Sequence, residues 1–223
     1  MRVVMLLGPP GSGKGTVAER LRGDRGGFVH LATGDMLREE VRQGSAVGRE
    51  AEGYMKRGEL VPDATIIRIV EARLDQGDNK ASYLFDGFPR TVVQADLLDQ
   101  SLRRRDSKIE TVLFLDTPRA VIIQRLTGRR VCRACGASFH VINIPPRREG
   151  VCDACGGELY QRKDDAEDTI VNRLEVYNRQ TESLIARYEA QGVLKRLRSD
   201  QGVDSLMREI EVILGGMSSR RGT

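Results

Sequence analysis

Four cysteines form two Cys-x-x-Cys pairs separated by sixteen residues. They are Cys132, Cys135, Cys152 and Cys155. A gap of about 15 to 20 residues between such pairs is typical of tetrahedral zinc sites, and four thiolates leave no coordination position open for a reacting molecule. The spacing therefore predicts a structural Zn²⁺. Two disulfides are the alternative, which a reducing compartment would disfavour.

The stretch between the two cysteine pairs contains few groups that could contact a nucleic acid. A nucleic-acid-binding ribbon is expected to interleave basic residues with exposed aromatics. This stretch offers only Phe139 and the pair Arg147 and Arg148. His140 is not needed as a ligand beside four thiolates, and neither it nor His30 is placed like a catalytic base. We interpret both histidines as packing or surface residues.

A glycine-rich segment, GPPGSGKGT from Gly8 to Thr16, follows an expected buried strand, VVMLL, and precedes an expected helix, VAERLR. This order is the context of a phosphate-binding P-loop, in which backbone N–H groups and a helix N-terminus face the phosphates. Lys14 would reach the terminal phosphates of a nucleoside triphosphate. Gly15 stands where a Mg²⁺-binding Ser or Thr usually follows the lysine. We therefore do not expect direct Mg²⁺ ligation there; a glycine turn without a ligand is the alternative.

Apolar runs alternate with amphipathic stretches along the chain, which predicts an α/β fold with a parallel sheet covered by helices on both faces. Four further strands are expected at FVHLA, YLFDGF, TVLFLD and VLKRL. Thr33 or Asp35 is expected to cap the helix after the second strand. The apolar spacing from Asp168 to Gln191 predicts one helix packed on the sheet.

Charged residues follow the strands at the end where ligands of such folds bind. Asp86 ends the third expected strand, where a P-loop protein needs a carboxylate to hold Mg²⁺ or its waters. Arg38 and Arg90 each follow a strand by a few residues, and a guanidinium there can bind a phosphate through two N–H groups. A turn aspartate and solvated surface charges are the alternatives.

The composition favours a soluble globular protein with one main core. Charged residues make up 30% of the 223 residues and are interspersed, and the net charge of +4 is weak for a dedicated nucleic-acid binder. We see no apolar run of about 20 residues and no secretory signal. We therefore expect a cytoplasmic protein with no nucleic-acid partner and no membrane partner, ending in a flexible tail at 215–223.

Several of these segments together resemble a known family. GPPGSGKGT, TGDMLR, DGFPRT with Gln94 four places after Arg90, LTGRR, and YQRKDD with Arg173 downstream are similar to the motifs of adenylate kinases of the long-lid, zinc-containing bacterial type. The resemblance implies a P-loop nucleoside monophosphate kinase fold with a five-stranded parallel sheet, and a monomer. The implied core comprises residues 1–32, 63–127 and 166–214, with an NMP-binding insertion at 33–62 and a zinc-bearing lid at 128–165.

The resemblance also implies a role for each matching residue. The implied catalytic residues are Lys14, Asp86, Arg90, Arg129, Arg162 and Arg173. The implied ATP-binding residues are Gly11, Ser12, Gly13, Lys14, Gly15, Thr16, Arg125, Arg129, Ser138, Phe139 and Gln201. The implied AMP-binding residues are Thr33, Arg38, Glu59, Leu60, Val61, Gly87, Phe88, Pro89, Arg90, Gln94, Arg162 and Arg173.

The implied reaction is MgATP + AMP ⇌ MgADP + ADP, serving nucleotide homeostasis. The expected partners are ATP, AMP and ADP, and the expected cofactors are structural Zn²⁺ and the Mg²⁺ that accompanies ATP, held largely through water and Asp86. Thr33 and Gln94 are expected to face the acceptor base, although Thr33 as a helix cap alone is the alternative. Two other functions stay open: a kinase for another nucleoside monophosphate, and a P-loop ATPase whose zinc ribbon docks on nucleic acid or protein.

Overall fold

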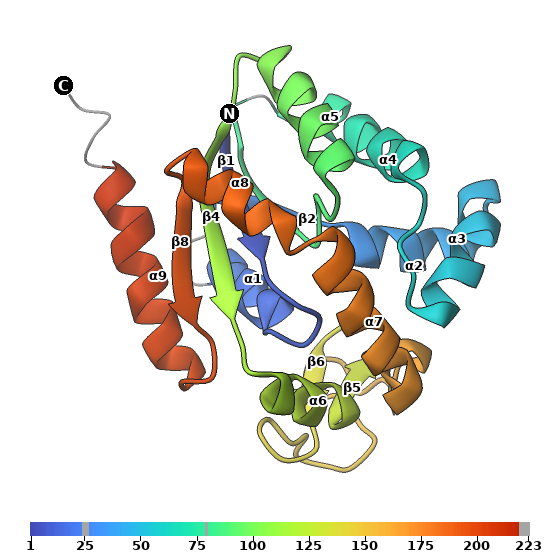
Figure 1. Cartoon of the computed structure of the whole chain (residues 1–223). Helices are drawn as coiled ribbons and strands as arrows, with labels where there is room; N and C mark the ends of the chain where they lie inside the picture. The colour runs from blue at the N-terminus through green and yellow to red at the C-terminus, as the bar shows by residue number, and fades with distance from the viewer. Residues whose placement is uncertain (24–26, 79, 219–223) are drawn as a thin grey trace.

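A five-stranded parallel sheet forms the centre of the computed structural model, which describes residues 1–23, 27–78 and 80–218 (Figure 1). The strands lie in the order β2-β3-β1-β4-β8, and every pairing between neighbours is parallel. Their bounds are β1 Arg2–Leu7, β2 Phe28–Ala32, β3 Ser82–Asp86, β4 Ile109–Asp116 and β8 Leu194–Arg198. The carboxyl ends of the strands therefore meet at one edge. The predicted fold class is confirmed.

The central strand β1 is buried because helices cover both faces of the sheet. Val3, Met5 and Leu7 pack in one apolar cluster, whereas Val4 and Leu6 pack in the other, because successive side chains of a strand point to opposite faces. The first cluster includes residues of α4 Asp63–Asp75, α5 Val92–Arg103 and α8 Ser183–Ala190. The second includes residues of α1 Lys14–Gly23 and α9 Val203–Ser218.

The two ends of the described chain are joined at the edge of the sheet opposite the carboxyl ends. Arg2 begins β1, and its Nη2 donates a hydrogen bond to the Leu214 carbonyl of α9 at 3.1 Å. Residues 215–218 complete α9. Of the flexible tail predicted at 215–223, residues 219–223 lie outside the described residues.

Two helices after β2, α2 Thr33–Gln43 and α3 Ala46–Arg57, form a tight hairpin before α4. Gly44 ends α2 in the left-handed region at φ 65°, and the Ser45 hydroxyl caps α3 by accepting from the Gly48 N–H at 2.9 Å. A Cβ on Gly48 would lie 2.1 Å from the Glu40 carbonyl oxygen, so the helices approach more closely than a side chain at this position allows.

A second, antiparallel sheet lies between α6 Arg119–Thr127 and the 3₁₀ turn η1 Lys163–Asp165. Its strands are β5 Arg129–Cys132, β6 Ser138–His140 and β7 Leu159–Tyr160, in the order β6-β5-β7. This small sheet carries the four cysteines near the connections of its strands. It lies beyond the carboxyl ends of the large sheet, beside α6 and α7 (Figure 1).

The prediction of one helix from Asp168 to Gln191 is wrong. The chain forms α7 Glu167–Gln180 and then α8, with a bend at Thr181 and Glu182. The Thr181 hydroxyl donates to the Arg90 carbonyl at 2.8 Å, which ties the bend to the loop after β3. Apolar spacing continues on both sides of the bend, so periodicity alone does not reveal it.

The predicted side-chain cap of α2 is also wrong. The helix begins at Thr33 with Ala32 in the capping position, and no side chain caps it. The Thr33 hydroxyl donates instead to the Gly87 carbonyl at 2.9 Å, across the gap between the β2 and β3 ends. Thr33 thus connects the start of α2 to the loop after β3.

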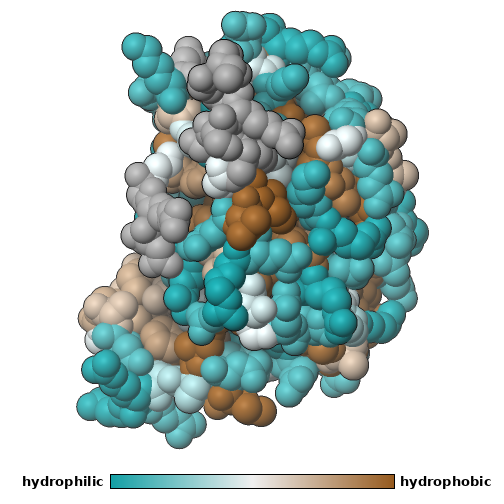
Figure 2. Space-filling model, turned by 90° about the vertical axis from the view of Figure 1, so that its left-hand side faces the viewer, coloured by the Kyte–Doolittle hydropathy of each residue, from teal (hydrophilic) through white to brown (hydrophobic). Residues whose placement is uncertain are grey.

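The surface on the α9 side is mostly hydrophilic, with small separate hydrophobic areas (Figure 2). Within residues 1–23, 27–78 and 80–218, every helix is too short or too polar to cross a membrane.

Candidate active site

The loop between β1 and α1 has a backbone that glycine adopts readily. Gly8, Gly11 and Gly13 have φ values of 149°, 79° and 98°. A Cβ on Gly8 would lie 2.8 Å from the Leu115 carbonyl oxygen of β4, so the loop also needs glycine for space. Because α1 begins at Lys14, its unpaired N–H groups face the loop. These features fit the predicted phosphate-binding nest.

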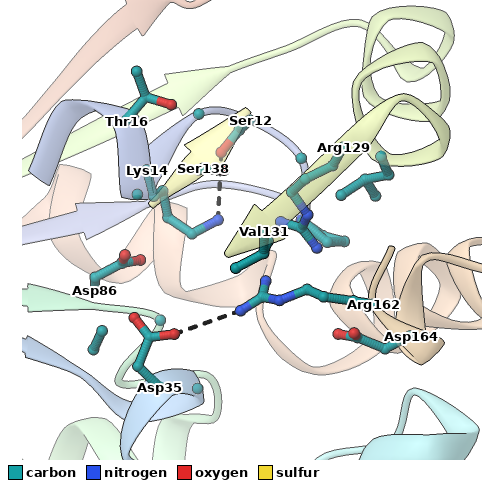
Figure 3. Close-up of a pocket in the computed structure, with 18 of the residues that line it drawn as sticks. Ser12, Lys14, Thr16, Asp35, Asp86, Arg129, Val131, Ser138, Arg162 and Asp164 are labelled. Carbon is teal, nitrogen blue, oxygen red and sulfur yellow. Dashed lines mark hydrogen bonds and ion pairs between the residues drawn. The ribbon is translucent and has the colours of Figure 1, made fainter. Parts of the chain in front are cut away.

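The Lys14 ammonium group lies within this loop. It donates to the carbonyls of Gly8 and Pro9, each at 2.8 Å, and lies 3.3 Å from the Ser12 hydroxyl (Figure 3). The pKa of Lys14 is lowered from 10.5 to about 7, chiefly by burial; the charge of Asp86 opposes this shift, and the charges of nearby arginines add to it. A bound anion would reverse this shift, because it would favour the charged amine.

Asp86 lies at the carboxyl end of β3 and faces the same cavity as Lys14 (Figure 3). Its Oδ2 lies 3.5 Å from Nε2 of His30 on the neighbouring strand β2. A carboxylate on this edge fits Mg²⁺ and its waters, which prefer oxygen ligands. Thr16 lines the cavity as well.

Nine arginines line one cavity of about 1520 Å³, which exceeds the ~300–1,000 Å³ of a typical single-ligand site, and five of them were expected to be catalytic or to bind AMP. These five are Arg38, Arg90, Arg129, Arg162 and Arg173. Burial, followed by the charge of Arg173, lowers the pKa of Arg90 to about 10. Burial, followed by the charges of Arg38 and Arg129, lowers the pKa of Arg162 to about 9. The cavity therefore carries a crowded positive charge suited to several phosphate groups.

Three carboxylates pair with these arginines, and none of them was predicted as a site residue. Asp165 has a fully buried side chain and binds Arg129 through two hydrogen bonds of 2.8 and 2.5 Å. Asp164 lies 2.9 Å from Arg173. The third carboxylate, Asp35, pairs with Arg38 and lies 3.5 Å from Arg162 (Figure 3). The available signal was their position inside TGDMLR and YQRKDD, beside arginines that were selected.

The residues expected to contact AMP lie around the ends of β2 and β3. Gln94 is 2% exposed; its Oε1 accepts from the Arg90 N–H and its Nε2 donates to Asp63, both at 2.7 Å. An amide oxygen accepts two hydrogen bonds and an amide nitrogen donates two, so each end of Gln94 keeps one free. Asp63, which positions Gln94, was not predicted.

The residues expected to contact the base of ATP lie on the other side of the P-loop. Arg125 of α6 donates from Nη2 to the Ser199 carbonyl at 2.6 Å and from Nη1 to the Ser12 carbonyl at 3.3 Å. Ser138, Phe139 and Gln201 line the cavity near it. Ser199, which holds Arg125, was another residue that the sequence did not indicate.

One predicted site residue lies away from the cavity surface. Phe88 is 1% exposed, and its ring packs 6.2 Å from that of Phe85 in the apolar core. The other predicted nucleotide-binding residues all line the cavity. Gly87 lies beside Arg90, where a Cβ would come 2.8 Å from the guanidinium.

The four cysteines lie together in the small sheet, with all Sγ atoms within 4.8 Å of one another. Cys132 lies 3.5 Å from Cys155, and Cys135 lies 3.6 Å from Cys152. Four thiolates around one Zn²⁺ at about 2.3 Å would lie about 3.8 Å apart, whereas a disulfide requires about 2.05 Å. The cysteines are unpaired, and the cluster contains neither histidine. The geometry fits a tetrathiolate zinc site.

Comparison with known proteins gives consistent matches. The family model described as adenylate kinase matches residues 6–193. An adenylate kinase of Caldicellulosiruptor bescii is 49% identical over 96% of this chain and 99% of its own length. Adenylate kinases of Clostridium tetani (46% identical, 96% of this chain) and Archaeoglobus fulgidus (44%, 97%) match across 99% of their lengths.

Proposed function

The chain belongs to the adenylate kinase family, whose members transfer a phosphoryl group reversibly between ATP and AMP, and from that premise we propose how its residues divide the reaction. The observation that carries the proposal is the convergence of Lys14 and five arginines on one cavity at the carboxyl edge of the sheet. Two nucleotides placed there would bring their phosphate groups together among these cations.

ATP occupies the side formed by the P-loop and α6. Its phosphates bind the N–H groups of residues 11–16, and Lys14 moves from the carbonyls of Gly8 and Pro9 to the phosphate oxygens. Arg125 lies against the adenine, near Ser138, Phe139 and Gln201. Support comes from the lowered pKa of Lys14, which an incoming anion would restore.

AMP occupies the side formed by α2 and the loop after β3. Arg38 and Arg90 bind its phosphate, and Thr33 and Gln94 face its base together with the residues at 59–61. No general base is required, because the second pKa of a phosphate near 6 leaves the acceptor oxygen ionised at neutral pH. The burial of Gln94 and its bond to Arg90 support this role, since they couple recognition of the base to placement of the phosphate.

Transfer takes place between the two nucleotides, where Arg129, Arg162 and Arg173 stabilise negative charge on the transferring oxygens. Asp165 and Asp164 hold the guanidinium groups of Arg129 and Arg173 in place before substrate arrives, and Asp35 lies 3.5 Å from Arg162. When bound with ATP, Mg²⁺ neutralises phosphate charge, and Asp86 would hold its water ligands.

Residues 128–165 act as a lid that excludes water during transfer, 33–62 bind AMP, and the remaining segments form the core. Exclusion of water is needed because a phosphoryl group in transit is open to hydrolysis. Zn²⁺ bound by the four cysteines stabilises the lid and takes no part in the chemistry. We further propose a cytoplasmic monomer that contributes to nucleotide homeostasis and binds no nucleic acid.

A nucleotide panel tests the assignment. Each nucleoside monophosphate is offered with MgATP, and ADP production is followed. AMP should exceed GMP, CMP and UMP in kcat/KM by about 10- to 100-fold, because an unpaired polar group in the site costs about 1–3 kcal/mol. Gln94→Leu should narrow this difference. Comparable activity with UMP or CMP would indicate a kinase for another monophosphate, and hydrolysis stimulated by a polymer would indicate an ATPase.

A further inference from the structure

His140 lies at the junction between the large core and the small sheet, on the wall of the nucleotide cavity. The chain leaves α6 at Gly128 and enters β5 at Arg129, and Arg129 is paired with His140 of β6. The Val141 N–H also donates to the Gly128 carbonyl at 2.9 Å. The histidine is therefore placed where the first lid strand meets the last turn of a core helix.

His140 is 7% exposed, and both nitrogens of its ring form hydrogen bonds. Nδ1 lies 3.0 Å from the N–H groups of Ile142 and of Asn143, so it accepts from both. A neutral imidazole that accepts at Nδ1 carries its hydrogen on Nε2. Nε2 lies 3.1 Å from the Gln124 carbonyl in the last turn of α6 and donates to it.

Gly128 supports this contact independently. Its φ of −84° and ψ of −6° suit any residue, so the backbone does not require glycine here. A Cβ at this position would lie 2.3 Å from His140 Nε2 and 2.5 Å from Cε1. Glycine at position 128 is thus explained by the space that the His140 ring occupies against α6.

The two elements that the ring joins each carry one arginine facing the ATP side. Arg125 of α6 is fixed to the core through Ser199 and Ser12. Arg129 of β5 is held by Asp165. We propose that His140 is a positioning residue that sets the distance between Arg125 and Arg129, and so the affinity for ATP. The inference rests on the proposed function for the identity of this ligand.

Two substitutions separate the two hydrogen-bonding ends of the ring. His140→Asn keeps an acceptor near the Nδ1 position and loses the donor to Gln124. His140→Gln keeps a donor near the Nε2 position and loses the local acceptor. Ile142→Ala is the matched control, because it retains the backbone N–H and removes a side chain that is 68% exposed. The Kd values for ATP and AMP are measured separately by calorimetry, with zinc content and kcat as further readouts.

We expect His140→Asn to weaken the binding of ATP about five-fold, which is the effect of one lost hydrogen bond. The affinity for AMP should stay within two-fold of the wild type, and the variant should still bind one zinc per chain. His140→Gln should retain most of the wild-type affinity for ATP. Gly128→Ala should lower the affinity for ATP, as His140→Asn does. Ile142→Ala should match the wild type.

Unchanged ATP affinity in His140→Asn, or equal losses of affinity for ATP and AMP, would overturn the positioning role. The role would also be overturned if His140→Asn lost its zinc and this loss explained the weaker binding of ATP. A wild-type protein that binds both nucleotides yet produces no ADP would refute the proposed function, while the ATP affinities of the variants would still decide the role of His140. A wild type that binds neither nucleotide would overturn both.

Discussion

Binding of ATP should be accompanied by proton uptake at Lys14. In the free protein the pKa of this amine is about 7, since burial and the surrounding arginines disfavour its charge. At pH 8 such an amine is about one-tenth protonated, and phosphates at the P-loop should return its pKa toward 10.5. Lys14 should therefore take up about 0.9 proton on binding at pH 8, but only about 0.1 at pH 6.

The assay is titration calorimetry with ATP in buffers of different ionisation enthalpy, where the slope of the observed enthalpy gives the number of protons taken up. ATP itself contributes little at pH 8, because its terminal phosphate titrates near pH 6. Arg162, with a pKa of about 9, would add about 0.1 proton. The linkage at Lys14 alone predicts that ATP affinity falls about nine-fold between pH 8 and pH 9.

Lys14→Met should abolish the uptake at pH 8, and Lys195→Met, which removes an exposed lysine of β8, should retain it. Buffer-independent enthalpies for the wild type at pH 8 would refute the argument that burial among arginines deprotonates Lys14 in the free protein. Equal uptake in Lys14→Met would assign the proton to another group.

Three further predictions concern other parts of the site. Cys152→Ser should contain no zinc in metal analysis and should melt at a lower temperature, because structural zinc contributes on the order of 10 kcal/mol to the folding of small modules. Its circular dichroism spectrum should retain most of the signal of the core. A zinc-free variant that melts like the wild type would contradict this prediction. Asp165→Asn should reduce the free energy of unfolding by about 2 kcal/mol, as measured by denaturant unfolding. This is less than the ~3–5 kcal/mol lost when a fully buried ion pair is broken, because asparagine keeps one acceptor for Arg129. Arg90→Ala should reduce kcat about 10³-fold and raise KM for AMP, with near-normal ATP affinity; steady-state kinetics in which both constants stay normal would remove Arg90 from the acceptor site.

The fold was predictable where local sequence decides the structure. Apolar runs between turn residues identified all five strands of the large sheet. The signal is strongest for β1, β3 and β4, which are buried and need apolar side chains on both faces. The single-helix prediction failed because the bend at Thr181 depends on a hydrogen bond to Arg90, which is distant in sequence.

The site was predictable where a motif follows a strand, and less so where charges pair across the cavity. Lys14, Asp86 and the arginines follow strands or occupy recognisable segments, and the structure brings them to one cavity. Asp165 was missed because its importance comes from burial against Arg129, which sequence spacing does not indicate. Phe88 was included because its neighbours face the cavity, but its ring turns into the core.

The hydrogen bond from Arg2 to the Leu214 carbonyl has a practical consequence for attaching this enzyme to other molecules. It places the start of β1 beside the end of α9, at the edge of the sheet opposite the nucleotide cavity (Figure 1). A fusion partner or an immobilising surface linked at the start of β1 or at the end of α9 would thus approach the same side of the molecule and leave substrate entry unobstructed. A short linker joining these two points would likewise permit a circular permutant whose new termini open in a surface loop, with the central strand β1 left intact.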